Sequence, residues 1–404
     1  MIAVLALLFL YQGPDSSAEG IKALDEHRYQ DAVNAFQKAI EADPKDYGVH
    51  FNLALAYSLL HRDADGVAEY RKTLELKPGL YEAELNEGIL LLRQRNAGEA
   101  LPLLEDAARQ KPSEYRPRYY VAEAELQTGD AAKAEGNYRA AIEANPKSAA
   151  AELGLGRALA KLDRLADAVA HFERAAAMDA AYKDALLELA DLYESHQQTD
   201  LALAIFRQFP ENAAVQEHAG HLMMQRKQYA EAIPGLERAY HDSPTEANRV
   251  ELALAYLFHE ERGKALPLLK EAAAADAGNF QIRMAYGRAL RDDHQFPAAE
   301  AEFAGAVKLQ AADASAWQDY ADMAYKNGHL EAALAAFDKV RELGKDTPGV
   351  WFFRAIILDS LKQTKPALEA YQHFLSVSGG KFPDQEWQAR QRVKLLEREA
   401  GKQP

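Results

Sequence analysis

Two histidines, His218 and His221, are the side chains whose type and spacing come nearest to a chemical site. They lie three residues apart, which on a helix puts both imidazoles on one face, with Glu217 beside them. Such a pair can begin a transition-metal site, but a third ligand is not apparent and the chain has no cysteine. We interpret the pair as surface or groove histidines, with a metal site as the alternative, and predict no bound metal.

The sequence contains none of the common catalytic signatures. It has no glycine-rich phosphate loop, no G-x-S-x-G turn and no H-E-x-x-H pair. We therefore predict no catalytic residue and no cofactor. The 404 residues include 47 basic and 62 acidic side chains, for a net charge of −15. Because an acidic chain repels phosphate, nucleic acid is not an expected partner.

The elements that would position a site follow from a repeat of 34 residues, which separates Pro44, Pro78, Pro112 and Pro146. Before each proline, a small and a bulky residue share one helical face. The small residues are Ala32, Gly66, Ala100 and Ala134, and the bulky ones are Phe36, Tyr70, Leu104 and Tyr138. Each set follows a further small residue on the preceding helix, namely Gly20, Ala54, Gly88 and Ala122.

Helix packing explains these residue types. Two antiparallel helices approach closely only where their side chains are small, so the small residue of the first helix should face that of the second. We expect the bulky residue to fill the space between adjacent repeats. The proline would end the second helix and turn the chain into the next repeat.

The same spacing continues after the prolines stop. The small residue of the first helix recurs as Gly156, Ala190, Gly220, Ala253, Gly287, Ala321 and Ala355, which brings the total to eleven repeats. This pattern resembles the tetratricopeptide-repeat family. The resemblance implies an all-α, right-handed superhelical solenoid of about eleven helix-turn-helix repeats with a C-terminal capping helix. Enzymes built on this repeat usually carry an added catalytic domain, for which the repeats leave no room, so we predict a non-enzymatic protein.

The sixth repeat departs from the pattern. Ala190 and Gly220 are only 30 residues apart, so its second helix should stop near Phe209 and Pro210, where we expect a kink or seam. The predicted organisation is an apolar segment at 1–12, six repeats at 13–212, five repeats at 213–380, and a capping helix with a tail at 381–404. Four apolar residues of the cap should cover the last repeat, namely Trp387, Val393, Leu395 and Leu396.

Residues 1–10 are apolar, but this run is too short to cross a bilayer and instead fits the core of a signal peptide. No basic residue precedes it, and the small-x-small exit at Ser16-Ser17-Ala18 lies within the first predicted helix. A packed N-terminal segment is the alternative. We predict a bacterial protein exported to the periplasm or outside the cell, with a cytoplasmic location as the alternative. Membrane association would involve only this segment.

The resemblance also implies a surface for a partner, because first-helix residues at fixed offsets from the small residue face the concave groove in this family. Carried over, the partner-binding residues are Asn52, Asn86, Arg116, Tyr119, Tyr120, Glu123, Arg157, Lys161, His221, Arg288, Asp322 and Tyr325. The same offsets give Arg291, Asp319 and Phe353. Tyrosine and arginine are common at binding hot spots. For each residue the alternative is a solvated wall or packing between first helices.

Chaperone-binding members of the family grip a C-terminal carboxylate with lysine and asparagine. Asn52 and Asn86 occupy the asparagine places, but Gly48 and Glu82 replace the lysines, which argues against that activity. We therefore predict a scaffold that holds another protein or peptide partner in its groove. The alternative is a structural protein that self-associates through its solenoid ends.

Overall fold

The computed structural model describes residues 15–400, and within that range the regular structure is helical, with no β-strand. The helices of the first half are α1 (Asp15–Asp25), α2 (Tyr29–Ala42), α3 (Tyr47–Leu59), α4 (Asp63–Leu76), α5 (Tyr81–Arg93), α6 (Ala97–Gln110), α7 (Tyr115–Thr128), α8 (Ala131–Ala144), α9 (Ala149–Lys161), α10 (Leu165–Met178), the short 3-10 helix η1 (Ala180–Tyr182), α11 (Ala185–Ser195) and α12 (Thr199–Phe206). Those of the second half are α13 (Ala213–Gln225), α14 (Tyr229–Asp242), α15 (Glu246–Phe258), α16 (Arg262–Ala275), α17 (Phe280–Asp292), α18 (Phe296–Leu309), α19 (Ala314–Lys326), α20 (Leu330–Glu342), α21 (Pro348–Ser360), α22 (Thr364–Ser378) and α23 (Pro383–Ala400). The predicted all-α class is confirmed.

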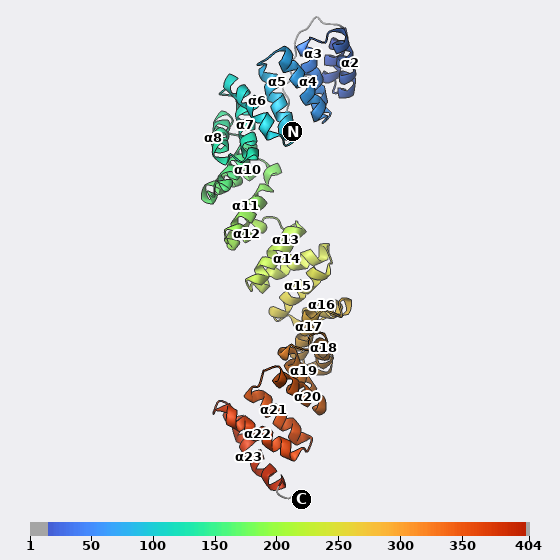
Figure 1. Cartoon of the computed structure of the whole chain (residues 1–404), viewed down its shortest axis with the longest axis vertical. Coiled ribbons are helices and arrows are strands. Elements are labelled where there is room, and N and C mark those ends of the chain that lie inside the picture. The colour runs from blue at the N-terminus through green and yellow to red at the C-terminus, as the bar shows by residue number, and fades with distance from the viewer. Residues whose placement is uncertain (1–14, 401–404) are drawn as a thin grey trace. The chain divides into compact units, whose positions relative to one another are not determined.

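The chain divides into two compact units, with the boundary between Ile205 and Phe206. Within each unit, consecutive helices pack in series, as α3, α4 and α5 do in unit 1 and α19, α20 and α21 do in unit 2 (Figure 1). Within the described residues, α1 to α22 form eleven consecutive helical hairpins, and α23 follows the last. The prediction of about eleven repeats with a C-terminal helix is confirmed.

Each hairpin turns at one residue in the left-handed backbone region. After α5, Arg95 has a φ of 60°; its amide donates to Leu92 O at 3.0 Å, and the Asn96 amide donates to Leu91 O at 2.8 Å. This pair of bonds closes the helix and starts the next one. The residues at this turn are His27, His61, Arg95, Gly129, Asp163, Gln197, Lys227, Glu260, His294, Gly328 and Lys362. Their spacing follows the repeat of the sequence.

Small residues let the two helices of a hairpin approach closely. A Cβ added to Gly66 of α4 would lie 3.3 Å from the carbonyl oxygen of Ala54 in α3. The expected contact between the two small positions of a repeat is therefore present.

The bulky residue packs differently from the prediction. Leu104 of α6 is fully buried, and its Cδ2 would lie 2.6 Å from a Cβ on Gly88, in the first helix of its own repeat. Tyr138 of α8 lies against Gly154 of α9, in the following repeat. The bulky side chain therefore packs beneath its own first helix and also reaches the next repeat, because it is long enough to span both.

The sixth repeat is shortened in its second helix. There α12 has 8 residues, whereas α4, α6 and α8 have 14 each. The helix ends at Phe206, three residues before the expected stop at Phe209, and the boundary between the two units falls inside it.

The C-terminal helix α23 covers the last hairpin with part of its apolar side. Leu396 is 1% exposed and Val393 packs against the same cluster, which includes Phe374 of α22. The expectation is wrong for Trp387 and Leu395, which are 62% and 45% exposed. They lie on a second stripe of the helix, and Ala389 is buried instead.

The predicted apolar segment at 1–12 lies outside the described residues. Ser16-Ser17-Ala18 lies in the first turn of α1, so cleavage after Ala18 would remove that turn. Within residues 15–400, no helix has the length and apolar character needed to span a bilayer.

Candidate functional site

The first helices of successive hairpins lie next to one another within each unit. In unit 1, α7 contacts both α5 and α9, and in unit 2, α15 contacts both α13 and α17. In each unit separately, we call the surface of the odd-numbered helices, α1 to α11 in unit 1 and α13 to α21 in unit 2, the first-helix face of that unit. All twelve predicted partner-binding residues lie on these helices.

Three of the predicted residues form polar contacts with an acid on the neighbouring first helix. Arg157 Nε donates to Glu188 at 2.8 Å, the Nδ1 of His221 lies 2.8 Å from Glu251, and Arg288 Nε donates to Asp319 at 3.0 Å. In each pair, the first residue follows the small residue of its helix by one position. The second precedes the next helix's small residue by two. These recurring pairs, which we call rungs, tie successive repeats together.

The tyrosines of α7 form an aromatic cluster in unit 1. Tyr119 stacks on Tyr115 with ring centroids 5.5 Å apart, and it meets Tyr120 at 5.1 Å and Tyr138 at 6.1 Å edge to face. Such aromatic pairs stabilise packing beyond the area they bury. The Tyr138 hydroxyl donates to Glu123. Two of the predicted partner-binding residues, Tyr119 and Tyr120, thus lie in ring contact with each other.

Burial dominates the electrostatics of this cluster. It raises the pKa of Tyr119 well above its ordinary value, and the neighbouring Glu123 carboxylate adds to the rise. The pKa of Tyr120 is also raised by burial, while the Arg116 cation opposes the change. These phenols therefore stay neutral and can act as hydrogen-bond donors at physiological pH. Lys161, the last residue of α9, is exposed.

Asn52 and Asn86 offer little surface to a partner. They are 6% and 1% exposed, and the Asn86 amide donates to the Tyr70 hydroxyl of the preceding repeat at 3.3 Å. Both amides contribute to packing inside unit 1.

A cavity of about 310 Å³ opens on unit 2, between α17, α19, α20 and α21. Its lining combines two of the predicted residues, Asp322 and Tyr325, with aromatic, polar and apolar neighbours. The other lining residues are Arg291, Gln318, Met323, Lys326, Phe337, Thr347, Gly349, Val350 and Phe353. It is at the lower end of the size range of ligand pockets, ~300–1,000 Å³. We call it the Asp322 cavity.

Aromatic rings form one wall of the Asp322 cavity. Phe353 lies parallel to the buried Phe337 at 5.8 Å between centroids, and Tyr325 meets it edge to face at 5.7 Å. The Phe353 ring is 37% exposed. Phe337 follows the small Ala333 by four positions, so the repeat pattern assigns it to the bulky core position. The pattern does not show that this side chain borders the cavity, because an offset from a small residue does not reveal which core side chains lie beside an opening.

The Asp322 carboxyl of α19 lines the cavity and has a raised pKa. Burial, followed by the negative charge of Asp319, raises its pKa to about 6, although Arg291 and Lys326 lower it. Within the described residues, no side chain donates a hydrogen bond to it. Arg291 instead pairs with Asp319 and Asp292, at 2.9 Å each.

The histidine pair is engaged in packing contacts. The His218 ring lies edge to face on Phe206 at 5.5 Å, and Gln225 lies 2.8 Å from Nε2 of His221, whose other ring nitrogen faces Glu251. Across residues 15–400, no group of three or more His, Asp or Glu side chains is arranged to hold a metal ion.

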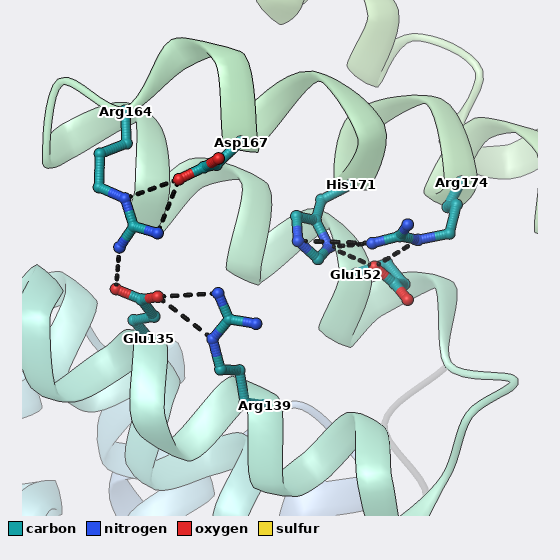
Figure 2. A network of polar contacts seen from close by, with 7 residues as sticks. All are labelled: Glu135, Arg139, Glu152, Arg164, Asp167, His171 and Arg174. Atoms are coloured by element: carbon teal, nitrogen blue, oxygen red, sulfur yellow. Dashed lines mark hydrogen bonds and ion pairs between the residues drawn. The ribbon is translucent and has the colours of Figure 1, made fainter.

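Polar networks on the second helices are satisfied internally. Figure 2 shows that Arg164 of α10 donates to Glu135 of α8 at 2.7 Å, while Glu135 also accepts from Arg139 at 2.9 Å. These bonds lower the pKa of Glu135, Arg139 contributing first. The Glu152 carboxylate lies 2.6 Å from His171 Nδ1 in the same view. The Arg164–Glu135 bond links two successive repeats.

Comparison with known proteins gives one family and several distant relatives. The family model described as tetratricopeptide repeat matches residues 17–81, 85–149, 122–185, 153–214 and 287–348, which together exceed half of the chain. A curated relative, DnaJ homolog subfamily C member 3 of Bos taurus, is 28% identical over 95 residues. The match spans 24% of this chain and 19% of that protein.

Two solved structures are among those to which the chain is similar. The protein MamA (residues 41 to the end) from Desulfovibrio magneticus RS-1 is 19% identical, with a TM-score of 0.40 over 42% of this chain and 97% of that one. YrrB, described as a TPR protein with an unusual peptide-binding site, is 24% identical, with a TM-score of 0.38 over 44% of this chain and 91% of its own.

Proposed function

Because this chain belongs to the tetratricopeptide-repeat family, whose members bind protein or peptide partners, we propose that it is a non-catalytic interaction scaffold. In this proposal, an extended segment of a partner protein lies on the first-helix face.

The Asp322 cavity is the observation that carries this proposal. It is an opening on the predicted binding face, and a buried core of aromatic side chains supports one of its walls. Aromatic residues and a few directed polar groups are what binding pockets commonly present. In unit 1, the half-buried Tyr119 and Tyr120 give the first-helix face of that unit its own neutral hydrogen-bond donors.

Selection from a display library of random, unstructured peptides would test the proposal, with the full chain as bait. We expect enriched peptides whose dissociation constants rise at least tenfold, by fluorescence anisotropy, when Tyr325 and Phe353 are both replaced by alanine. The matched control is Leu309→Ala, which removes an apolar side chain 43% exposed on the second helix α18. Failure to enrich any peptide would overturn the proposal, and so would equal loss of binding in the control.

Self-association through the ends of the solenoid is the second candidate function. The exposed Trp387 and Leu395 on the outer side of α23 favour it, because they place apolar surface at the C-terminal end. Light scattering at several protein concentrations separates the candidates. Growth in mass that Trp387→Glu abolishes would support self-association, and a constant monomer mass would exclude it.

Export of the protein stays a prediction from residues 1–10. Fractionation of cells that produce the untagged chain, with mass spectrometry of its N-terminus, would show whether this segment directs secretion and is removed.

A further inference from the structure

The Asp322 cavity occupies the place of a rung that is not formed. Asp322 follows Ala321 by one position, as Arg157, His221 and Arg288 follow the small residues of their helices. Two positions before Ala355, where the other rungs have an acid, stands Phe353. An acid therefore faces an aromatic ring where three other pairs of first helices have a polar contact, and the two side chains line a common cavity.

The two cationic side chains near Asp322 interact with other partners. On α17, Arg291 donates to Asp319 and Asp292. On α19, Lys326 Nζ lies 4.5 Å from the centroid of the Phe296 ring. The lining contributed by α20, α21 and the residue before α21 is uncharged, namely Phe337, Thr347, Gly349, Val350 and Phe353. Within residues 15–400, Arg291 therefore has ion pairs and Lys326 has a cation–π contact, whereas the Asp322 carboxylate forms neither an ion pair nor a side-chain hydrogen bond.

A carboxylate beside exposed aromatic rings is complementary to one class of side chain. A cation is attracted by the negative face of an aromatic ring, and it also neutralises a half-buried carboxylate. An acidic group would be repelled by Asp322 and Asp319. A purely apolar group would leave the carboxylate desolvated and unpaired, which is unfavourable.

We propose that the Asp322 cavity receives the side chain of a lysine or arginine from the bound partner segment. The cation lies against Phe353 and Tyr325 and pairs with Asp322, so it completes the missing rung from outside the chain. This inference rests on the proposed function and adds the chemistry of the residue that is recognised. The cavity volume of about 310 Å³ suits one long side chain.

The raised pKa of Asp322 gives the interaction a pH dependence. The charged groups facing this carboxyl are Arg291 of α17 with Asp319 and Lys326 of α19, and α20 and α21 add none. With a pKa of about 6 in the free protein, most of the carboxyl is ionised at pH 7.5 and protonated at pH 5. Binding of a cation should therefore weaken about tenfold at pH 5.

Methyl NMR tests the proposal without any partner, because Met323 lines the cavity. The full chain carries ¹³C-methyl methionine and is titrated with Nα-acetyl-lysine amide or Nα-acetyl-arginine amide. The neutral analogue Nα-acetyl-norleucine amide and the acidic Nα-acetyl-glutamate amide are the comparison probes. We expect the Met323 resonance to shift with the two cations and to respond at least tenfold more weakly to the other two probes.

Substitutions then assign the effect to the carboxylate. Asp322→Asn should weaken cation binding at least tenfold, whereas Asp384→Asn, on the exposed first turn of α23, should leave it unchanged. An unmoved Met323 resonance, an equal response to norleucine, or unchanged binding by Asp322→Asn would each overturn the proposal. Peptide selection can still succeed in that case, so the outcome is distinguishable from failure of the proposed function.

Discussion

The first-helix faces of unit 1 and unit 2 present residues at the same offsets from the small residue of each helix. The position one after that small residue nevertheless has a side-chain partner in α7 and α9 of unit 1 and borders a cavity in α19 of unit 2. In unit 1, the Glu123 carboxylate accepts from Tyr138, and Arg157 pairs with Glu188. In unit 2, Asp322 stands at the same offset as Glu123 and Arg157 but borders an open cavity. The difference teaches that the same repeat position is engaged or open according to the partner that its own repeat or the next one supplies, as Tyr138 does for Glu123 and Glu188 does for Arg157.

Truncation of the bulky core residue should lower the free energy of unfolding more than any other change considered, and it should do so in both units, because the bulky position is packed in the same way in each. We expect Leu104→Ala in unit 1 to cost about 2–5 kcal/mol and Phe303→Ala in unit 2 about 3–5 kcal/mol, as for other buried large-to-small changes. Both side chains are fully buried against a glycine of their own repeat. Chemical denaturation measures the cost, and hydrogen exchange should locate it in the altered unit. An unchanged midpoint for either variant would show that its side chain is not part of the core.

Asp322→Asn should change the free energy of unfolding in a pH-dependent way, which would distinguish the cavity acid of unit 2 from Glu123 of unit 1. The folded-state pKa of about 6 exceeds the ordinary value near 3.9, so the folded chain binds more protons than the unfolded chain between about pH 4 and 6. The charge therefore destabilises the fold above pH 6, and this cost disappears as the pH falls toward 4.

The variant should consequently be more stable than the natural chain by on the order of 1–3 kcal/mol at pH 7.5. The gain should shrink at pH 4.5, which urea denaturation at the two pH values would show. Glu123→Gln is the matched control in unit 1, because its acceptor oxygen already has a donor. A loss of stability at pH 7.5 in Asp322→Asn would contradict the picture of an uncompensated carboxylate.

Tyr119→Phe should give the smallest effect. The Tyr119 hydroxyl makes no hydrogen bond within the described residues, and its ring contacts do not need the oxygen. Stability should stay within about 0.5 kcal/mol of the natural chain. The same change should weaken binding of any selected peptide that contacts unit 1. A large stability loss, measured by thermal unfolding, would reveal a structural role for the hydroxyl.

The repeat could be predicted from the sequence because its packing leaves a regular trace. Glycine or alanine is needed where the helices cross, and one bulky residue is needed beside them, so both recur along the chain. The offsets also picked out Asp322 and Tyr325 of α19, which line the cavity. The offsets could not show that the Asn86 amide donates a hydrogen bond to the Tyr70 hydroxyl, because that contact depends on which bulky residue the preceding repeat carries.

The repeat pattern could not predict the cavity or the exposed apolar residues of α23, for a related reason. Phe337 occupies a regular core position and borders an opening only because Phe353 stands beside it. Helix α23 has two apolar stripes, and either could have covered the last hairpin. The stripe with Ala389 and Leu396 is buried, whereas the stripe with Trp387 is exposed. Local periodicity gives the candidates, whereas shape complementarity selects among them.

The reach of the bulky side chain into the following hairpin limits how freely such a chain could be rearranged. Tyr138 fits because Gly154 leaves room for its ring, and the Tyr70 hydroxyl accepts from Asn86. A repeat moved to another place would bring its tyrosine against a neighbour shaped for a different partner. Duplication or shuffling of single repeats should therefore fail unless the residue sixteen positions further on is transferred with them.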